Sequence, residues 1–248
     1  MMMSLLLTLA YDGSDYSGWV IQKKHLTIQG ELNKAIKNVI KNNDFKTIGS
    51  SKTDAHVHAS DQKVLLTINF EIKNLERFQQ ALNKALSTAI QILSIEIVSS
   101  DFNIRHARQK EYEYTLNDVD TNVFSARFEE QWKYGKIDIA KLQSILKVFI
   151  GEHDFKLFSG LSLEEQKTIT TVRTIENIKV LRIDNKVKII FNGKAFIRYQ
   201  IRMIVGTALK AYLGKVSLST ISEKLQGSGT KLPYVANAAG LCLKKIIF

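Results

Sequence analysis

The chain has very little cysteine and no long apolar segment, and both absences limit what it can be. Its single cysteine, Cys242, excludes an internal disulfide bond and agrees with a reducing compartment, so we expect a cytoplasmic protein. The apolar start at residues 1–10 lacks a basic flank and is too short to span a bilayer, so it predicts a buried strand. No other segment is long and apolar enough for a membrane helix, which predicts a soluble protein without a membrane partner.

Acidic residues are outnumbered by basic ones. With 35 Lys and Arg against 24 Asp and Glu, the 248 residues carry a formal net charge of +11. This excess predicts a polyanionic partner, with nucleic acid as the first choice and an acidic membrane surface as the second. Basic residues alternate with aromatic rings in two regions, and the pair of features suits phosphate neutralisation beside base stacking. The candidate RNA contacts in these regions are Arg105, Arg108, Lys110 and Arg198.

Hydrophobic periodicity predicts an α+β protein made of two similar halves. Residues 1–105 and residues 106–248 each read as β-α-β-β-α-β, which is the ferredoxin-like arrangement. Asp138 is expected to cap a helix of the second half, and Asp184 and Asn185 are expected to form the tight turn of a hairpin. No linker separates the halves. We therefore expect one mostly antiparallel sheet with helices on one face and a central cleft.

The loop at residues 49–62 gathers small, hydroxyl, acidic and imidazole side chains between two predicted strands. It reads Gly-Ser-Ser-Lys-Thr-Asp-Ala-His-Val-His-Ala-Ser-Asp-Gln. A connection on a rigid frame is a usual place for reactive groups, and Asp54 is the central acid of this one. The structural alternative is an Asx turn or a cap, in which the carboxylate of Asp54 accepts backbone N–H bonds.

His56 and His58 in the same loop also allow a metal site. Alternate histidines on an extended segment can share a face and bind zinc, and Asp54 and Asp61 flank this pair. The rest of such a site is missing, because the other histidines of the chain stand in unrelated contexts and Cys242 is alone. A metal-dependent hydrolase that uses His56 and His58 is therefore kept as a minority alternative.

Residues 51–59 resemble the catalytic motif of the TruA family of tRNA pseudouridine synthases, Gly-Arg-Thr-Asp-Ala-Gly-Val-His-Ala. This chain has Ser-Lys-Thr-Asp-Ala-His-Val-His-Ala, so Lys52 replaces the arginine of the family and His56 replaces its second glycine. Lysine keeps the charge but lacks the planar fork of arginine. Glycine tolerates left-handed backbone geometry, and histidine adopts that geometry more often than most residues do.

Further motifs of the family follow in the same order along the chain. Residues 11–19 resemble Tyr-Asp-Gly-x-x-(Tyr/Phe)-x-Gly-Trp, and residues 101–114 resemble Phe-His-Ala-Arg followed by Arg-x-Tyr-x-Tyr. Residues 151–155 resemble Gly-x-His-Asp-Phe, and residues 196–206 resemble a helix that ends in Val-Gly. Residues 237–241 depart from the Thr-Ala-Pro-Ala-x-Gly-Leu of the family. The resemblance covers nearly the whole chain.

The resemblance implies the pseudouridine synthase fold and an isomerase that converts uridine to pseudouridine at positions 38, 39 and 40 of the tRNA anticodon stem-loop. It implies Asp54 as the catalytic aspartate, Arg202 as its partner and Tyr112 as the ring that stacks on the target base, with Lys52 also at the substrate. No metal or organic cofactor is implied, since the isomerisation is redox-neutral. The implied partners are tRNA and a second copy of the chain in a homodimer. A catalytically altered RNA-binding relative, suggested by Lys52 and His56, is the other alternative.

Arg202 can also be argued without the family. It lies in a helix expected over residues 196–213, where the neighbours Ile201, Met203 and Ile204 are apolar and indicate a buried element. A buried guanidinium requires a carboxylate partner. The alternatives, in which Arg202 reaches solvent or binds a phosphate, stay open at this level.

Overall fold

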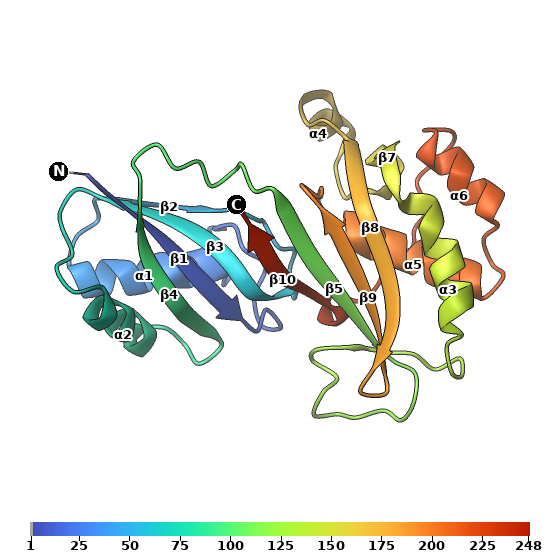
Figure 1. Ribbon diagram of the computed structural model, residues 1–248, viewed down its shortest axis with the longest axis horizontal. Coiled ribbons are helices and arrows are strands. Elements are labelled where there is room, and N and C mark those ends of the chain that lie inside the picture. Colours follow the sequence, from blue (N-terminus) through green and yellow to red (C-terminus); the bar gives the residue numbers. More distant parts are fainter. Residues whose placement is uncertain (1) are drawn as a thin grey trace. The chain divides into compact units, whose positions relative to one another are not determined.

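The computed structural model describes residues 2–248, which form two compact units (Figure 1). The first unit holds the chain up to Arg108 together with Cys242–Phe248, and the second unit is Gln109–Leu241. The expected division between residues 105 and 106 lies close to the first of these boundaries. Strand β10 (Leu241–Ile247), expected in the second half, instead pairs in parallel with strand β3 (His58–Ile68) of the first unit.

The first unit has the element order that the sequence predicts. It contains a β-α-β-β-α-β arrangement in which β1 pairs in antiparallel register with both β3 and β4. The other edge of β3 pairs with β2 over Val64 to Ile68 and with β10 at His58 and Ala59. The remaining elements of this arrangement are β1 (Met3–Tyr11), α1 (Ile28–Ile40), β2 (Phe45–Gly49), α2 (Leu75–Ala85) and β4 (Ile90–Val98).

Alternating apolar residues build the core of the first unit. Helices α1 and α2 cover the same face of the sheet (Figure 1). Alternate residues of a strand point to the same face of the sheet, and residues three or four positions apart lie on the same face of a helix. Apolar residues at these two spacings therefore face each other between the sheet and the helices. The fully buried residues from these elements include Leu5, Leu7 and Leu9 of β1, Val64 and Leu66 of β3, Leu32 and Ile36 of α1, and Leu82 of α2.

The second unit is a sheet in the order β5-β9-β8-β7, with antiparallel neighbours throughout. The short strand β6 runs parallel to β5 at its end. Helices α3 and α5 pack on each other, and α3 also packs on β8. The elements are β5 (Gln109–Asn117), β6 (Glu130–Gln131), α3 (Ile139–Leu146), β7 (Gly151–Asp154), α4 (Leu163–Thr168), β8 (Val172–Ile183), β9 (Lys186–Gly193), α5 (Gln200–Tyr212) and α6 (Leu218–Leu225).

Two local predictions for the second unit are confirmed. Asp138 caps α3, because its Oδ1 accepts the backbone N–H of Lys141 at 3.1 Å. Asp184 and Asn185 have φ values of 49° and 61°, the left-handed geometry that suits the tight turn of the β8–β9 hairpin. The helix expected from residue 196 begins only at Gln200, since the residue before it has left-handed backbone geometry.

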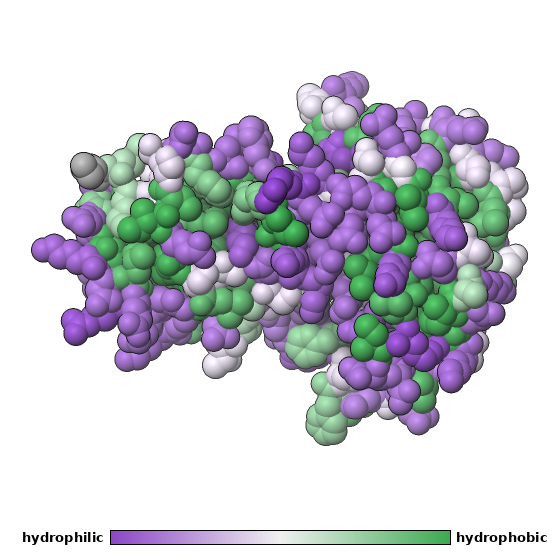
Figure 2. Space-filling model, in the orientation of Figure 1, coloured by the Kyte–Doolittle hydropathy of each residue, from purple (hydrophilic) through white to green (hydrophobic). Residues whose placement is uncertain are grey.

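The chain is therefore an α+β protein with mostly antiparallel strands, as the sequence predicts. Hydrophilic residues predominate over strand β5 on the viewed face of the second unit (Figure 2). Exposed polar residues of β8 include Thr174, Glu176 and Lys179. No helix within residues 2–248 has both the length and the apolar composition that a membrane crossing requires.

Candidate active site

The loop that follows β2 is bound along its length to the loop that follows β1. The backbone N–H of Trp19 donates to the carbonyl of Thr53 at 3.1 Å, and the N–H of His56 donates to the carbonyl of Tyr16 at 3.0 Å. The Val57 N–H closes a turn onto the Asp54 carbonyl at 3.2 Å. Two motifs that lie far apart in the sequence, residues 11–19 and the predicted catalytic loop, thus form one substructure.

Glycine is required where these two loops touch. A Cβ on Gly13 would lie 2.0 Å from the carbonyl oxygen of Val57, closer than any real side chain allows. Gly18 has a φ of 94°, and a Cβ there would approach the Thr53 carbonyl oxygen to 2.9 Å. The glycines of the Tyr-Asp-Gly and Gly-Trp motifs therefore permit the close approach of the two backbones.

Buried polar side chains hold the loop that contains Asp54. The side chain of Gln62, which is fully buried, accepts the N–H of Ser51 at 3.2 Å and donates to its carbonyl at 2.8 Å. The hydroxyls of Tyr11 and Thr53 lie 2.8 Å apart inside the unit. Because a buried polar group is costly when left unpaired, these bonds fix the loop in one conformation.

Asp54 lies at the centre of this fixed loop. Its neighbour Thr53 and the turn residue Val57 are buried, whereas Asp54 itself is half-buried and Lys52 is exposed. The irregular part is shorter than the predicted 49–62, since β3 already begins at His58 and pairs with β1 from Ala59 onward. The acid is therefore presented by a short connection between two paired strands, partly open to solvent.

The two histidines of the loop turn to different partners. The Nδ1 of His56 donates to the carbonyl of Ser14 at 2.6 Å, and the ring is exposed. His58 is buried, and its Nδ1 lies 3.1 Å from the N–H of Gly13 and 3.2 Å from Asp12 Oδ1. Within residues 2–248, no group of three or more His, Cys, Asp or Glu is placed to hold a metal ion. The metal alternative gains no geometric support from this pair.

His56 occupies the left-handed backbone region that a glycine would tolerate, with a φ of 65°. We expect His56→Val to destabilise the protein by about 1–3 kcal/mol more than His56→Gly, because a β-branched residue is strongly disfavoured at positive φ. Both variants lose the hydrogen bond to Ser14, so the difference between their free energies of unfolding reports the cost of the left-handed backbone geometry. Urea unfolding of the two variants measures it, and equal midpoints at equal slope would contradict the expectation.

In the second unit, the predicted stacking residue Tyr112 lies in β5. Its side chain is 8% exposed and makes an edge contact with the ring of Phe196, with centroids 5.3 Å apart. Phe191 of β9 is its partner in register. Tyr112 is thus held among rings by the neighbouring strand and by the segment that leads into α5.

Arg202 lies in the first turns of α5, whose other residues there are buried. Arg202 is only half-buried; its Nε donates to the carbonyl of Ala236 at 2.9 Å, and the Ala236 N–H donates back to the Arg202 carbonyl at 2.9 Å. Its guanidinium also lies 5.1 Å from the ring centroid of Tyr199, a cation–π contact. Tyr199 has a φ of 64°, which is unusual for a bulky residue and indicates backbone strain close to Arg202.

The sequence analysis missed the role of Tyr114. Its hydroxyl bonds to Glu130 and to the carbonyl of Asn237, the latter at 2.8 Å, and burial together with the charge of Glu130 raises its pKa well above the usual value. The phenol therefore stays neutral and donates. The alternation that places Tyr112 on one face of β5 also places Tyr114 there, and a buried tyrosine needs a partner, so the signal was present.

The predicted RNA contacts have different surroundings. Arg105 is exposed, and exposed Arg108 donates to the carbonyl of Phe248 at 2.7 Å. Arg198 is bound within the protein, because its guanidinium makes bonds of 2.8 and 2.7 Å to the two carboxylate oxygens of Glu165. This pairing, with bonds from Ser162, lowers the pKa of Glu165 to about 2. Much of the Arg198 charge is therefore neutralised inside its own unit.

Named relatives match the chain over nearly its full length. The tRNA pseudouridine synthase A of Mesoplasma florum is 57% identical over 250 residues, which cover 100% of this chain and 99% of the relative. That of Spiroplasma kunkelii is 44% identical and covers 99% and 94%, and that of Aquifex aeolicus is 34% identical and covers 99% and 100%. The chain belongs to the tRNA pseudouridine synthase family.

A family model described as tRNA pseudouridine synthase also matches residues 145–248, which include Arg202 and its partner segment. Asp54 lies in the first unit of this tRNA pseudouridine synthase family member, whereas Tyr112 and Arg202 lie in the second. The ion pair of Asp54 with Arg202 that the resemblance implies would involve one residue of each unit, and it stays a prediction.

Proposed function

We propose that the protein isomerises uridine to pseudouridine in tRNA with Asp54 as its catalytic aspartate. The observation that carries this proposal is the fixation of the Thr-Asp-Ala segment by the Tyr11–Trp19 loop on one side and by Gln62 on the other. A loop locked in this way holds one carboxyl group in place without reorganisation, which is what a reacting group requires.

The reaction conserves all atoms of the nucleoside. The N1–C1′ bond of uridine breaks and a C5–C1′ bond forms, while C5 loses a proton and N1 gains one. Asp54 acts on the uridine as nucleophile or as base, and either role requires its ionised carboxylate. Because the change is redox-neutral and transfers no group to water, the proposal needs no metal and no organic cofactor.

The second unit contributes the proposed substrate contacts. A uracil in a stem must leave its stack, at a cost of roughly a few kcal/mol, and stacking on an aromatic ring offsets part of that cost. Tyr112 is the proposed stacking ring, since Phe196 and β9 hold it in place. Arg202 is the proposed partner of Asp54, and the bond from its Nε to the Ala236 carbonyl orients the guanidinium. Lys52, exposed beside Asp54, is a proposed contact to the substrate.

The proposed substrate sites are positions 38, 39 and 40 in the anticodon stem-loop, and the proposed assembly is a cytoplasmic homodimer. Family membership and the formal charge of +11 support a tRNA partner. Mapping pseudouridine in unmodified tRNA transcripts after incubation with the wild-type protein tests the activity and the position together. Product at 38–40 is expected; no product with any tRNA would favour a non-catalytic RNA-binding relative.

Lys110 makes the proposed tRNA binding sensitive to alkaline pH. Burial lowers the pKa of this half-buried lysine from 10.5 to about 8. A phosphate contact requires the ammonium form, so the proton is held below pH 8 and lost above it. We expect tRNA affinity to fall as the pH rises from 7 to 9, by up to about tenfold per pH unit above 8.

The Lys110→Met variant provides the control for this titration. It should bind tRNA more weakly than the wild type at pH 7, and its affinity should depend less on pH. The slope of log affinity against log salt concentration should also be smaller by about one. Filter binding at constant ionic strength measures both proteins. An unchanged profile in Lys110→Met would remove Lys110 from the set of RNA contacts.

A further inference from the structure

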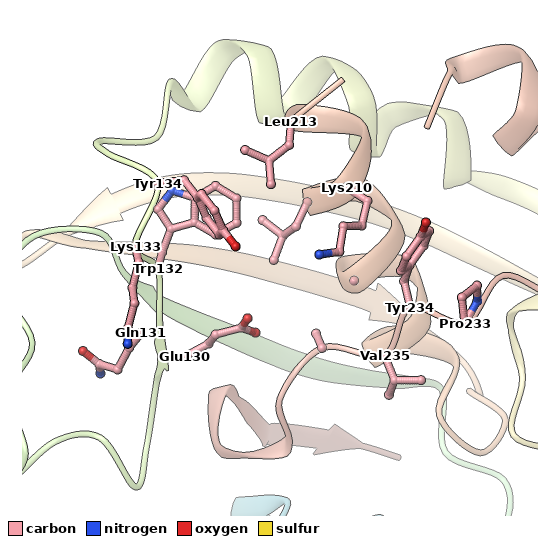
Figure 3. A pocket seen from close by; sticks show the side chains of 13 residues that line it. Glu130, Gln131, Trp132, Lys133, Tyr134, Lys210, Leu213, Pro233, Tyr234 and Val235 are labelled. Carbon is pink, nitrogen blue, oxygen red and sulfur yellow. The ribbon is translucent and has the colours of Figure 1, made fainter. Parts of the chain in front are cut away.

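The second unit contains a pocket of about 390 Å³ between the segment 130–134, the C-terminal half of α5 and the segment 233–236 (Figure 3). All of its lining residues belong to this one unit. The side chains that define its chemistry are Glu130, Trp132, Tyr134, Lys210 and Tyr234. Neither the proposed reaction nor the family motifs in the sequence account for this group.

Aromatic rings form two sides of the pocket. Trp132 and Tyr134 lie together on one side, with ring centroids 4.9 Å apart, and Tyr234 lies on the opposite side next to Lys210 (Figure 3). Trp132 is 7% exposed, whereas Tyr134 is 62% exposed and accessible to a ligand. A space of this size between rings suits a flat heterocycle, and every nucleobase has a π-face that can stack.

The pocket also contains one positively and one negatively charged side chain, Lys210 and Glu130. The Nζ of Lys210 lies 5.7 Å from the ring centroid of Tyr234 and points into the pocket (Figure 3). The carboxylate of Glu130 also faces the pocket, and its Oε2 is held by the Tyr114 hydroxyl and by the Asn237 N–H at 3.2 Å. A fixed carboxylate accepts an amino or imino proton of a base, and a lysine at this distance suits a phosphate. The ligand class is therefore a nucleotide.

The pocket adjoins the proposed catalytic residues of its unit. Ala236 lines it and accepts the Nε of Arg202, and Gly206, another lining residue, follows Arg202 by one helical turn. Lys210 is two turns from Arg202, which corresponds to about 12 Å along the helix. A nucleotide in the pocket would thus lie a short distance from a uracil that is stacked on Tyr112 and close to Arg202.

We propose that this pocket binds an unpaired nucleotide of the same tRNA, with its base between Tyr134 and Tyr234, an N–H of the base on Glu130 and its phosphate on Lys210. The inference rests on the proposed function for the identity of the RNA. A free nucleoside monophosphate offers the same chemistry, so the experiment must separate the two sources. The bound nucleotide would position the substrate relative to the reacting uridine.

Trp132 provides a direct readout of occupancy, because its ring forms part of the pocket wall. Titration of the wild-type protein with tRNA should quench tryptophan emission, and the quench should disappear in Trp132→Phe. Tyr134→Ala and Lys210→Met should each raise the Kd for tRNA about tenfold. Phe124→Ala and Lys179→Met, which remove an exposed ring and an exposed lysine elsewhere in the same unit, should leave it within about twofold.

The same titration with AMP, GMP, CMP and UMP separates the sources. Quenching at micromolar tRNA, but only at millimolar mononucleotide, supports a nucleotide of the tRNA as the ligand. A mononucleotide that binds as tightly as tRNA overturns the proposal in favour of a free ligand. Equal Kd values for the pocket and control variants, with no Trp132 signal, would also overturn the inference. If the wild-type protein still forms pseudouridine in that case, the proposed function stands; a Trp132 signal without any product would reject the function and keep the pocket.

Discussion

Replacement of Asp54 by asparagine is expected to reduce pseudouridine formation by at least about 10³-fold. The amide has nearly the same shape as the carboxylate but can neither attack the nucleoside nor accept its proton. The backbone bonds that fix the loop, from Trp19, His56 and Val57, do not involve the side chain of residue 54, so the loop should keep its conformation. Single-turnover assays with excess enzyme measure the chemical step separately from binding.

Binding and folding distinguish this result from a general defect. Asp54→Asn should bind tRNA within a fewfold of the wild type and unfold at a similar urea concentration. Asp101→Asn, which neutralises an exposed aspartate of the same unit, should keep full activity. Product formation by Asp54→Asn at the wild-type rate would rule out the proposed role of Asp54 and would call for a different acid or base in the molecule.

Replacement of Asp118 by asparagine should cost about 3–5 kcal/mol of stability, the typical result of breaking a buried ion pair. The Asp118 side chain is 0% exposed and makes two bonds to Arg182, at 2.8 and 2.7 Å. It also accepts the N–H of Ile137 at 2.6 Å. An asparagine leaves the guanidinium without its counter-charge. Urea unfolding compares the variant with Asp120→Asn, an exposed neighbour that should change the free energy of unfolding by less than about 0.5 kcal/mol.

The same pair makes stability depend on acidity. Hydrogen bonds from Arg182 lower the pKa of Asp118 below the usual 3.8 in the folded state. The unfolded chain therefore binds this proton first as the pH falls, and the contribution of the pair, complete above pH 4, is lost as the pH falls through the folded pKa. Unfolding free energies from pH 6 to pH 3 should converge for the wild type and Asp118→Asn. Parallel curves would show that Asp118 is not the titrating group.

The first unit could be derived almost entirely from periodicity. The apolar run at the start of the chain predicted the buried strand β1, Val64, Leu66 and Ile68 alternate in β3, and helix α1 repeats its apolar residues at helical spacing. The second unit was less accessible, since the strand Gly151–Asp154 is too short for a period and pairs only at the edge of β8. The placement of β10 depends on a partner far away in sequence, and no local pattern encodes such a pairing.

The candidate site divides in the same way. The loop around Asp54 was located because its residue types are unusual between two strands. The backbone geometry of His56 stayed open in the sequence, and the structure shows it to be left-handed. The sequence indicates that a buried Tyr114 needs a partner, but it does not show that this partner is Glu130 or that Glu165 pairs with Arg198, because tertiary packing alone brings these residues together. The residue types in a sequence indicate which groups can react, whereas the partners of those groups can be identified only in the folded structure.

The pairing of β10 with the first residues of β3 has a consequence for biosynthesis. Cys242 and Leu243 lie beside His58 and Ala59, directly where the Asp54 loop ends, and the Ile246 N–H donates to Asp61 at 2.8 Å. The whole second unit is translated between these partners. A nascent chain on the ribosome therefore exposes an unpaired edge of β3 next to the Asp54 loop until the second unit has emerged, and this edge is completed only when the late segment arrives.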